Sequence, residues 1–418
     1  MGADEPYYQL QACEVSAKLH ALLQFACLTL RSGSTADRTC TLLRRIAVKV
    51  GLDEFAVGIT FETVLVSTRV QGAAYTAMRE VGPPAIDASR IVALERWVDH
   101  LAPAASPRMI ADDLSQLERP IRRQSSAALA IAIGAACGGF AFLNGAAAPA
   151  MLAAALAGAM GQSLRLWLAV RGFTQYGAVA LAAAAASSTY AIAAELIDVA
   201  GFAFASYGAG FIASVLFLVP GVSLIGGLFD LLHYRMAVAI GRLAYGAMIM
   251  LSAALGLSVV IGLAHVDAVG QPTTHLVYPM ALVLRGVASF IAAAAFAMLF
   301  NSPRKVILIA GFHALAANSF RLVLDDLGIM LAPATFLAAL CIGISGIQME
   351  RRLGLPAIVT TVAPIVIMIP GVTAFEAIVL LNDGQINEAL EALASCGFLV
   401  GALALGLAGA TLFRARAR

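Results

Sequence analysis

Long apolar runs fill the chain from Ser125 onward, and short polar segments separate them about every thirty residues. Each run is close to the roughly 20 residues that an α-helix needs to cross the hydrocarbon core of a bilayer. A soluble domain has no use for so many runs of this length, so the pattern predicts a mainly α-helical, polytopic membrane protein. The ten predicted spans, of which the fourth and ninth are interrupted, are residues 125–143, 147–168, 176–194, 200–220, 237–263, 276–299, 305–323, 329–349, 355–381 and 389–412.

The first 122 residues show a different pattern, with normal charge density and amphipathic helical periodicity. The segment "FAVGITFETVLVSTRV" is rich in β-branched residues and predicts two strands or a hairpin. We therefore expect a small α/β domain at residues 1–122, on the cytoplasmic side, with "RPIRRQ" (119–124) marking the start of the membrane portion. The predicted helices of this domain are residues 10–31, residues 35–50 with a stop at Gly51, and residues 87–101 with Asp87 as N-cap.

Composition agrees with a membrane protein. The chain is 61% hydrophobic and 12% charged, with a mean hydropathy of +0.87, whereas soluble domains are about half apolar and a quarter charged. The net charge of +2 gives no reason to expect a nucleic-acid partner. Six scattered cysteines lack metal-ligand spacing, so we expect free thiols, no metal and no cofactor. The polar, acidic start "MGADEPYYQL" does not have the pattern of a secretory signal peptide.

The placement of charge predicts the orientation of the spans. From Arg119 onward, fourteen of sixteen Lys and Arg residues fall on the same side of the predicted membrane as the N-terminal domain. An excess of positive charge marks cytoplasmic loops, so both termini are expected in the cytoplasm. The acidic residues predicted for the opposite side are Glu195, Asp198, Asp267, Asp325, Asp326, Asp383 and Glu388.

The apolar portion contains a weak internal repeat. Residues 144–173 resemble residues 301–329, with four matching positions at a constant separation of 156 residues. These matches are Ser163 with Ser319, Arg165 with Arg321, Leu166 with Leu322, and Gly172 with Gly328. Five spans per half would invert the second half, which predicts inverted five-helix repeats at residues 123–265 and 266–418. Chance similarity between Ala-rich segments is the alternative.

Two of the spans contain the same interruption. "FLVPGVSLIGGLFDLL" places Gly221 after a proline, and "IMIPGVTAFEAIVLL" places Gly371 there, 150 residues later. Pro-Gly breaks a helix, and we expect Ser223 and Thr373 to cap the helices that resume. The free N–H groups of the resumed helices suit an anion such as a substrate carboxylate. The alternative is a proline kink that only improves packing.

Several polar residues within the spans add to this candidate site. Arg285 is predicted near mid-membrane, where it either clamps a substrate carboxylate or pairs with Asp230, Glu376 or a carbonyl group. Asp230 and Glu376 follow the two Pro-Gly motifs, and each is a candidate to bind an ammonium group or the coupling proton. Burial in apolar surroundings favours the protonated form of a carboxylate, which allows proton loading and release. Two further intramembrane polar residues are Asn318 and Arg321, the latter expected to pair with Asp325.

The order of several motifs resembles the bacterial threonine/serine exporter family over nearly the whole chain. These motifs are "LTLRSGSTADRTCTLLRRIAVKVGL", "LVPGVSLIGGLFDLL", "GRLAYG", "PATFLAALCIGISG" and "TVAPIVIMIPGVTAFEAI". The resemblance implies ten spans in the inner membrane, a cytoplasmic N-terminal domain, and proton-driven export of threonine and serine. Related proteins split over two chains are associated with export of dicarboxylates such as succinate, so that substrate stays an alternative.

Two other functions fit the sequence less well. The N-terminal domain contains Ser32, Ser34, His20 and His100, but none of the common hydrolase or phosphate-binding motifs, so a membrane-anchored hydrolase is the weaker interpretation. Ser34 or Thr35 is better explained as a helix cap. A passive channel is the other alternative. A homo-oligomer is compatible with the sequence, which leaves the oligomeric state open.

Overall fold

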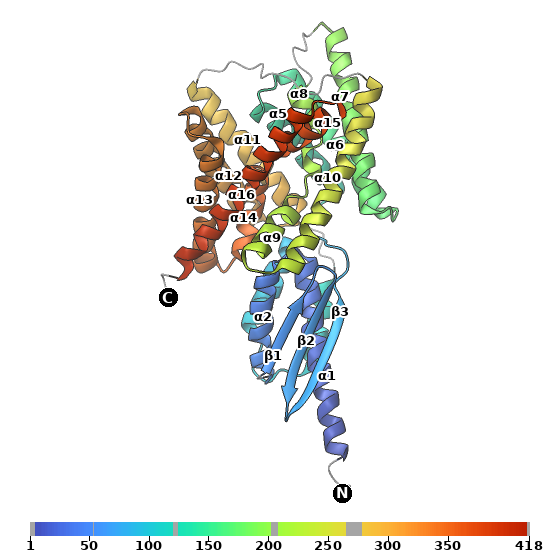
Figure 1. Ribbon diagram of the computed structural model, residues 1–418, viewed down its shortest axis with the longest axis vertical. Helices are drawn as coiled ribbons and strands as arrows, with labels where there is room; N and C mark the ends of the chain where they lie inside the picture. The colour runs from blue at the N-terminus through green and yellow to red at the C-terminus, as the bar shows by residue number, and fades with distance from the viewer. Residues whose placement is uncertain (1–4, 53, 120–123, 202–207, 265–277, 416–418) are drawn as a thin grey trace. The chain divides into compact units, whose positions relative to one another are not determined.

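The computed structural model describes residues 5–52, 54–119, 124–201, 208–264 and 278–415 (Figure 1). The predictions for Asp267, for residues 120–123 and for the arginines at 416 and 418 lie outside the described residues. The chain forms two compact units. The N-terminal unit contains Met1–Arg122 and also Gly226–Leu243, and the helical unit contains Arg123–Ile225 and Ala244–Arg418.

The N-terminal unit has helices on one face of a three-stranded antiparallel sheet in the order β1-β2-β3. Its elements are α1 (Glu5–Arg31), α2 (Ala36–Lys49), β1 (Glu54–Ile59), β2 (Thr63–Val70), β3 (Ala73–Glu80), α3 (Ala88–His100) and α4 (Pro107–Glu118). The predicted helix caps are confirmed. Thr35 Oγ1 accepts the N–H of Arg38 at 3.3 Å, and Asp87 Oδ1 accepts the N–H of Arg90 at 3.0 Å.

Two elements of this unit were missed by the sequence analysis. The predicted hairpin is a three-stranded meander, because Gln71 and Gly72 form a two-residue turn with φ of 51° and 85° that leads into β3. Positive φ at both positions is typical of a tight hairpin turn, but the sequence of β3 is rich in Ala and has a weak strand signal. Helix α4 has a readable start that was overlooked, since Ser106 caps it and Pro107 occupies its first turn.

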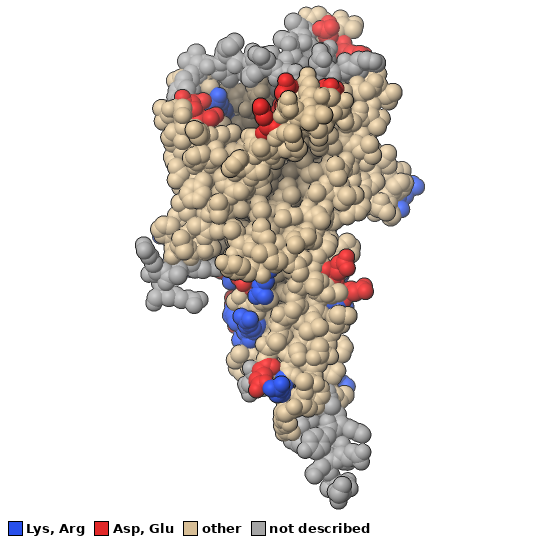
Figure 2. Space-filling view, in the orientation of Figure 1, with Lys and Arg blue, Asp and Glu red and all other residues tan. Residues whose placement is uncertain are grey.

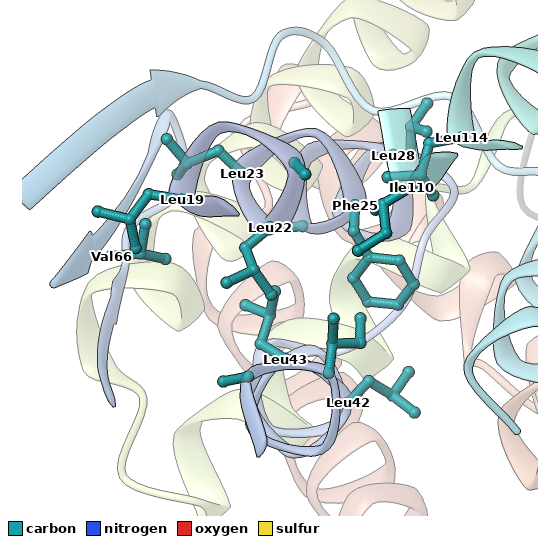
Figure 3. Close-up of a cluster of buried hydrophobic side chains, with 14 of the residues drawn as sticks. Leu19, Leu22, Leu23, Phe25, Leu28, Leu42, Leu43, Val66, Ile110 and Leu114 are labelled. Atoms are coloured by element: carbon teal, nitrogen blue, oxygen red, sulfur yellow. The ribbon is translucent and has the colours of Figure 1, made fainter. Parts of the chain in front are cut away.

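A single apolar core holds the N-terminal unit together (Figure 3). Leu22 of α1 points toward Leu43 of α2, whereas Leu23 lies on the side of α1 away from α2, and all three are at most 1% exposed. In α2 the buried residues Thr39, Leu43 and Ile46 recur at helical spacing, so one face of that helix is covered, whereas α1 is buried on nearly all sides between residues 21 and 30. On the sheet, Val66 of β2 points toward α1. This core makes the unit a folded domain and not a peripheral tail.

The helical unit is built from long apolar helices. Two of them, Gly221–Leu232 and Met236–Ala264, are shared with the N-terminal unit, which contains the end of the first and the start of the second. The elements are α5 (Ser126–Leu143), α6 (Ala148–Val170), α7 (Gln175–Val199), α8 (Gly208–Ala213), η1 (Leu216–Leu218), α9 (Gly221–Leu232), α10 (Met236–Ala264), α11 (Tyr278–Leu299), α12 (Arg304–Asp326), α13 (Leu331–Leu353), α14 (Ala357–Val366), α15 (Gly371–Asn382) and α16 (Ile386–Ala415). Among the described residues, eight helices are long and apolar enough to span a membrane, or ten if two bent pairs each count as one span.

The bent pairs fall where the sequence has its interruptions. Gly210–Leu218 and Gly221–Leu232 are bent by 62°, and Ala357–Val366 and Gly371–Asn382 by 45°. The fourth predicted span was therefore misplaced, because its apolar character continues through α9 beyond residue 220. Charged side chains are scarce over the tan surface of the helical unit, and acidic residues gather at one end of it (Figure 2). This distribution is the one expected of a protein surrounded by lipid.

The element boundaries repeat along the chain. Helices α6 and α12 are both 23 residues long and begin 156 residues apart, and α7 and α13 begin 156 residues apart as well. Helices α9 and α15 are both 12 residues long and begin 150 residues apart, as do α10 and α16. These separations are the two that the sequence motifs had suggested.

Candidate functional site

The two Pro-Gly breaks pack against each other in a reciprocal way. A Cβ added to Gly221 would lie 2.6 Å from Val366 Cγ2 and 2.9 Å from Ile369 Cδ1. A Cβ added to Gly371 would lie 3.0 Å from Leu216 Cδ2 and 3.1 Å from Val219 Cγ2. Each contact becomes the other when 150 is added to or taken from the residue numbers. Such exchange of roles is the signature of a two-fold relation between the two contacting surfaces.

The same relation extends to the helices behind the breaks. Gly246 of α10 faces Pro220, with 3.7 Å between its added Cβ and the proline Cγ. Cys396 of α16 occupies the corresponding place, and its Sγ lies 3.9 Å from the carbonyl oxygen of Pro370. Deeper in these helices, Gly256 packs on α7 and Gly406 packs on α13. Glycine is needed at these positions because the backbones approach closely, as is common between membrane helices.

The helices resume at the glycines themselves, which corrects the predicted caps. Helix α15 begins at Gly371, its N-cap is Pro370, and no side chain caps it. Thr373 therefore lies inside the first turn of α15, and Ser223 lies at the same position of α9. The prolines supply the capping carbonyl groups, since Leu224 donates to Pro220 O at 3.1 Å and Ala374 to Pro370 O at 3.0 Å. Amides of the intervening residues have no partner in their own helix, as at any helix start.

Thr373 and Glu376 lie on the same face of α15, because residues three apart are neighbours on a helix. Both side chains are half-buried. Within the described part of the chain, no hydrogen bond or ion pair joins the Glu376 carboxylate to another side chain. Its counterpart in the first half, 150 residues earlier, is Gly226. The two halves thus share the broken backbone but only one of them adds a carboxylate close to it.

Arg285 has a partner that the sequence analysis did not consider. Its Nη1 lies 2.8 Å from Oδ2 of Asp326, and the two side chains are 33% and 30% exposed. The predicted pairs with Asp230 or Glu376 are therefore wrong. Arg285 is the eighth residue of the 22-residue α11, about 10 Å from the start of that helix and about 5 Å before its middle.

Arg321 also differs from the expectation. No ion pair within 4.0 Å joins it to Asp325 in the described structure; instead its Nε donates to Oδ1 of Asn318 at 2.9 Å. Asn318 in turn donates to Ser289 Oγ at 2.8 Å, and Ser289 donates to the carbonyl oxygen of Arg285 at 2.7 Å. Arg285, Asn318 and Arg321 are thus joined in one polar chain between α11 and α12. In the first half, Arg165 Nε donates to Gln162 Oε1 at 3.1 Å, at the corresponding positions.

Asp230 belongs to the N-terminal unit and not to the Pro-Gly breaks. Its fully buried carboxylate accepts the N–H of Ala36 at 2.9 Å and lies 3.3 Å from Arg242 Nε. Arg242 also donates to the carbonyl oxygen of Ser34 at 2.5 Å. Gly226 makes room for this arginine, because a Cβ there would lie 2.6 Å from Arg242 Nη1. Asp230 therefore fixes the tip of the α9–α10 hairpin to the start of α2.

Sequence reasoning passed over one histidine in the middle of an apolar run. His313 of α12 has its Nε2 2.7 Å from Ser345 Oγ of α13 and its Nδ1 3.3 Å from the carbonyl oxygen of Thr360 in α14. The signal was present, since an ionisable residue within a predicted span is a candidate functional residue by default.

The helices and their repeated breaks define a multi-pass membrane protein. A family model described as "Putative threonine/serine exporter" matches residues 20–264, and a second, described as "Threonine/Serine exporter, ThrE", matches residues 285–413. The chain therefore belongs to the threonine/serine exporter family, as its motifs had suggested. It is a membrane transporter by family, which favours this class over an enzyme.

Two relatives illustrate the range of similarity. A Mycobacterium tuberculosis protein described as "Probable threonine/serine exporter" is 27% identical over 420 residues, which cover 93% of this chain and 75% of that protein. A Haemophilus influenzae protein described as "Uncharacterized protein" is 29% identical over 126 residues, which cover 28% of this chain and 42% of that protein. No solved structure matches the chain.

Proposed function

We propose that this protein exports threonine and serine across the bacterial inner membrane, in exchange for protons, by alternating access. The observation that carries the proposal is the reciprocal packing of Gly221 against Val366 and Ile369, and of Gly371 against Leu216 and Val219. Many secondary transporters have two five-helix halves related by a two-fold axis, and each half contributes one broken span beside that axis. The names given to the family and to the mycobacterial relative support the choice of substrate.

In this proposal the substrate binds beside the two breaks. The amides that begin α9 and α15, near Ser223 and Thr373, face the substrate carboxylate, because helix starts carry partial positive charge. Glu376, on the same face as Thr373, receives the substrate ammonium group. The hydroxyl groups of Ser223 and Thr373 then contact the small polar side chain of threonine or serine.

In this proposal the two halves have opposite orientations in the membrane, and this arrangement allows alternating access. With ten spans and two inverted five-helix repeats, rocking of one half against the other opens the site to each side in turn. Basic residues at one set of helix ends and acidic residues at the other support cytoplasmic N- and C-termini. The two chain segments of the N-terminal unit, residues 1–122 and 226–243, would then both lie at the cytoplasmic side.

Feeding of dipeptides tests the function in cells. A strain without the gene, given threonine- or serine-containing dipeptides, should accumulate the free amino acid inside, and the restored gene should lower that level and raise the level outside. An uncoupler should abolish the difference, whereas efflux that ignores the uncoupler would indicate a passive channel. Equal accumulation with and without the gene, together with gene-dependent efflux of succinate, would replace the substrate.

A further inference from the structure

The second half of the helical unit contains a polar contact that joins three helices. It joins His313 of α12, Ser345 of α13 and Thr360 of α14. His313 is the tenth residue of a 23-residue helix, so it lies about 14 Å along a helix about 34 Å long. The half-buried imidazole is thus at mid-depth of a predicted span.

The partner of Nδ1 follows from the sequence of α14. In an α-helix the carbonyl of Thr360 would accept the N–H of residue 364, but that residue is Pro364, which has no N–H. His313 supplies the missing donor at 3.3 Å. Because a carbonyl oxygen only accepts, the proton of the neutral ring is on Nδ1, and Nε2 is left as the basic nitrogen.

The partner of Nε2 is able to serve both protonation states. The hydroxyl of Ser345, 2.7 Å away, donates to a neutral Nε2 and accepts from a protonated one. Only rotation of the hydroxyl hydrogen separates the two arrangements. The ring can therefore gain and lose a proton while both of its nitrogens keep their partners.

On the described helices that pack around His313, the charged side chains lie away from the ring or are bound to other partners. On α12 itself, the charged residues lie in the first turn or from Arg321 onward, and Arg321 is bound to Asn318. On α11, Arg285 is paired with Asp326. On α13, the thiol of Cys341 is exposed and the charged residues occupy the last turn, while α14 has no ionisable side chain.

The corresponding place in the first half is filled differently. Residues 156 positions before His313 and Ser345 are Ala157 and Thr189, and Thr189 donates within its own helix. The ring of Tyr190, which is fully buried, covers Gly210, the counterpart of Thr360. Among the described residues, a histidine therefore occupies this place in the second half, and an alanine occupies it in the first.

We propose that His313 carries the coupling proton of transport, bound at Nε2 against Ser345 and tied through Thr360 to the first arm of the second broken span. Because Thr360 lies in α14, which leads into the Pro-Gly break, a change of ring charge acts directly on that arm. This inference rests on the proposed function, since it names the proton carrier of the same transport cycle.

Proteoliposomes separate coupling from substrate binding. His313→Gln keeps a donor for Thr360 but cannot take up a proton, so it should retain threonine exchange across the membrane and lose accumulation driven by a pH gradient. His100→Gln, on the exposed face of α3, is the matched control and should keep both activities. Gradient-driven accumulation by His313→Gln equal to that of the wild type, with an unchanged pH profile, would overturn the proposal.

A second variant covers the case in which His313→Gln does not fold. Ser345→Ala removes the hydroxyl that donates to the neutral ring and accepts from the protonated ring. The bond to the charged, protonated ring is the stronger of the two, so its loss disfavours protonation. The pH profile of transport should therefore shift to lower pH by at least half a unit (about a threefold change in proton affinity). A slower rate with an unshifted profile would show a merely structural histidine.

A direct titration distinguishes this inference from the substrate assignment. In the ¹⁵N spectrum of the labelled full-length protein, one histidine ring should take up a proton at Nε2 while its Nδ1 stays protonated throughout, and Ser345→Ala should move that titration. Failure to titrate would overturn the role of His313 whatever the substrate. Titration in a protein that moves neither threonine nor serine would instead overturn the proposed substrate.

Discussion

The carboxylate of Asp230 accepts the backbone N–H of Ala36 at 2.9 Å, so a residue near the end of α9 holds the first turn of α2. The negative charge lies at a helix N-terminus, where the helix dipole favours it. Arg242, 3.3 Å away, neutralises the same carboxylate. Neither residue has an ionic counterpart 150 positions later, where the chain has Leu380 and Ala392. The N-terminal unit thus includes the tip of the α9–α10 hairpin, whereas the α15–α16 tip belongs to the helical unit.

Removing this charge should destabilise the N-terminal unit. Asp230→Asn leaves Arg242 buried without its anion, and breaking a buried ion pair in this way costs about 3–5 kcal/mol. Thermal unfolding of the purified full-length protein in detergent measures the loss. The control is Arg235→Gln, whose partner Asp37 is 4.0 Å away and exposed, and whose loss should cost less than about 1 kcal/mol. Full stability of Asp230→Asn with abolished export would return Asp230 to the transport site.

Adding a methyl group at the close contact between the two breaks should destabilise the protein, and a compensating substitution should restore the stability. Gly221→Ala places a methyl group against Val366, a stiff β-branched side chain, and overpacking of this kind costs about 1–3 kcal/mol. Val366→Ala in the same chain should restore most of the loss, as a double-mutant cycle of unfolding energies would measure. Gly401→Ala on α16, which meets nothing within 4 Å, is the control. Additive effects of the two substitutions would contradict the contact.

Neutralising Glu376 should separate transport from folding. Glu376→Gln keeps the size of the side chain and removes the charge proposed to bind the substrate ammonium group, so threonine efflux should fall at least tenfold with an unchanged melting temperature. Glu391→Gln, an exposed residue of α16, should leave efflux unchanged. Wild-type efflux by Glu376→Gln would remove this carboxylate from the site.

Exchanging the charges of Arg285 and Asp326 should discriminate a structural pair from a substrate clamp. Arg285→Gln alone should slow export several-fold, because it leaves Asp326 without its partner at 2.8 Å. The double variant Arg285→Asp with Asp326→Arg should recover most of the rate, since the pair reforms between the same two helices. If the double variant stays as slow as the single one, the arginine is needed at position 285 itself and binds the substrate.

High pH should destabilise the N-terminal unit through two buried thiols. Burial raises the pKa of Cys27 and of Cys40 above the ordinary value of 9.0, with nearby arginines opposing the effect only in part. The folded protein therefore holds these thiol protons more tightly than the unfolded chain, and the resulting stability is complete below about pH 9 and is lost as the pH rises through the raised pKa. Melting temperatures measured from neutral to alkaline pH should fall less in Cys40→Ala than in the wild type. If the melting temperatures of Cys40→Ala and of the wild type fall in parallel with pH, the raised pKa of Cys40 is contradicted.

Much of the candidate site was readable along the chain. Pro220 and Pro370 remove backbone donors wherever the chain folds, and the following glycines permit the sharp bend, so the two breaks follow from local chemistry alone. Side-chain partners were not readable in this way. Arg285 was expected to pair with Asp230 or Glu376, but its partner is Asp326, the last residue of the next helix, α12. Partners so far apart in sequence depend on how two helices pack, which no local pattern reports.

The sequence by itself determined the apolar spans, the two interruptions, the helix cap at Asp87 and a second cap at Ser34 or Thr35, which the structure assigns to Thr35. The separations of 156 and 150 residues were also visible in the sequence. Each of these depends on hydrophobic length or on the backbone chemistry of a few adjacent residues. Only the tertiary structure decided that Asp230 belongs to the N-terminal unit and that His313 satisfies the carbonyl freed by Pro364. These outcomes depend on which buried polar groups meet, because a polar group removed from water takes the nearest partner that packing supplies.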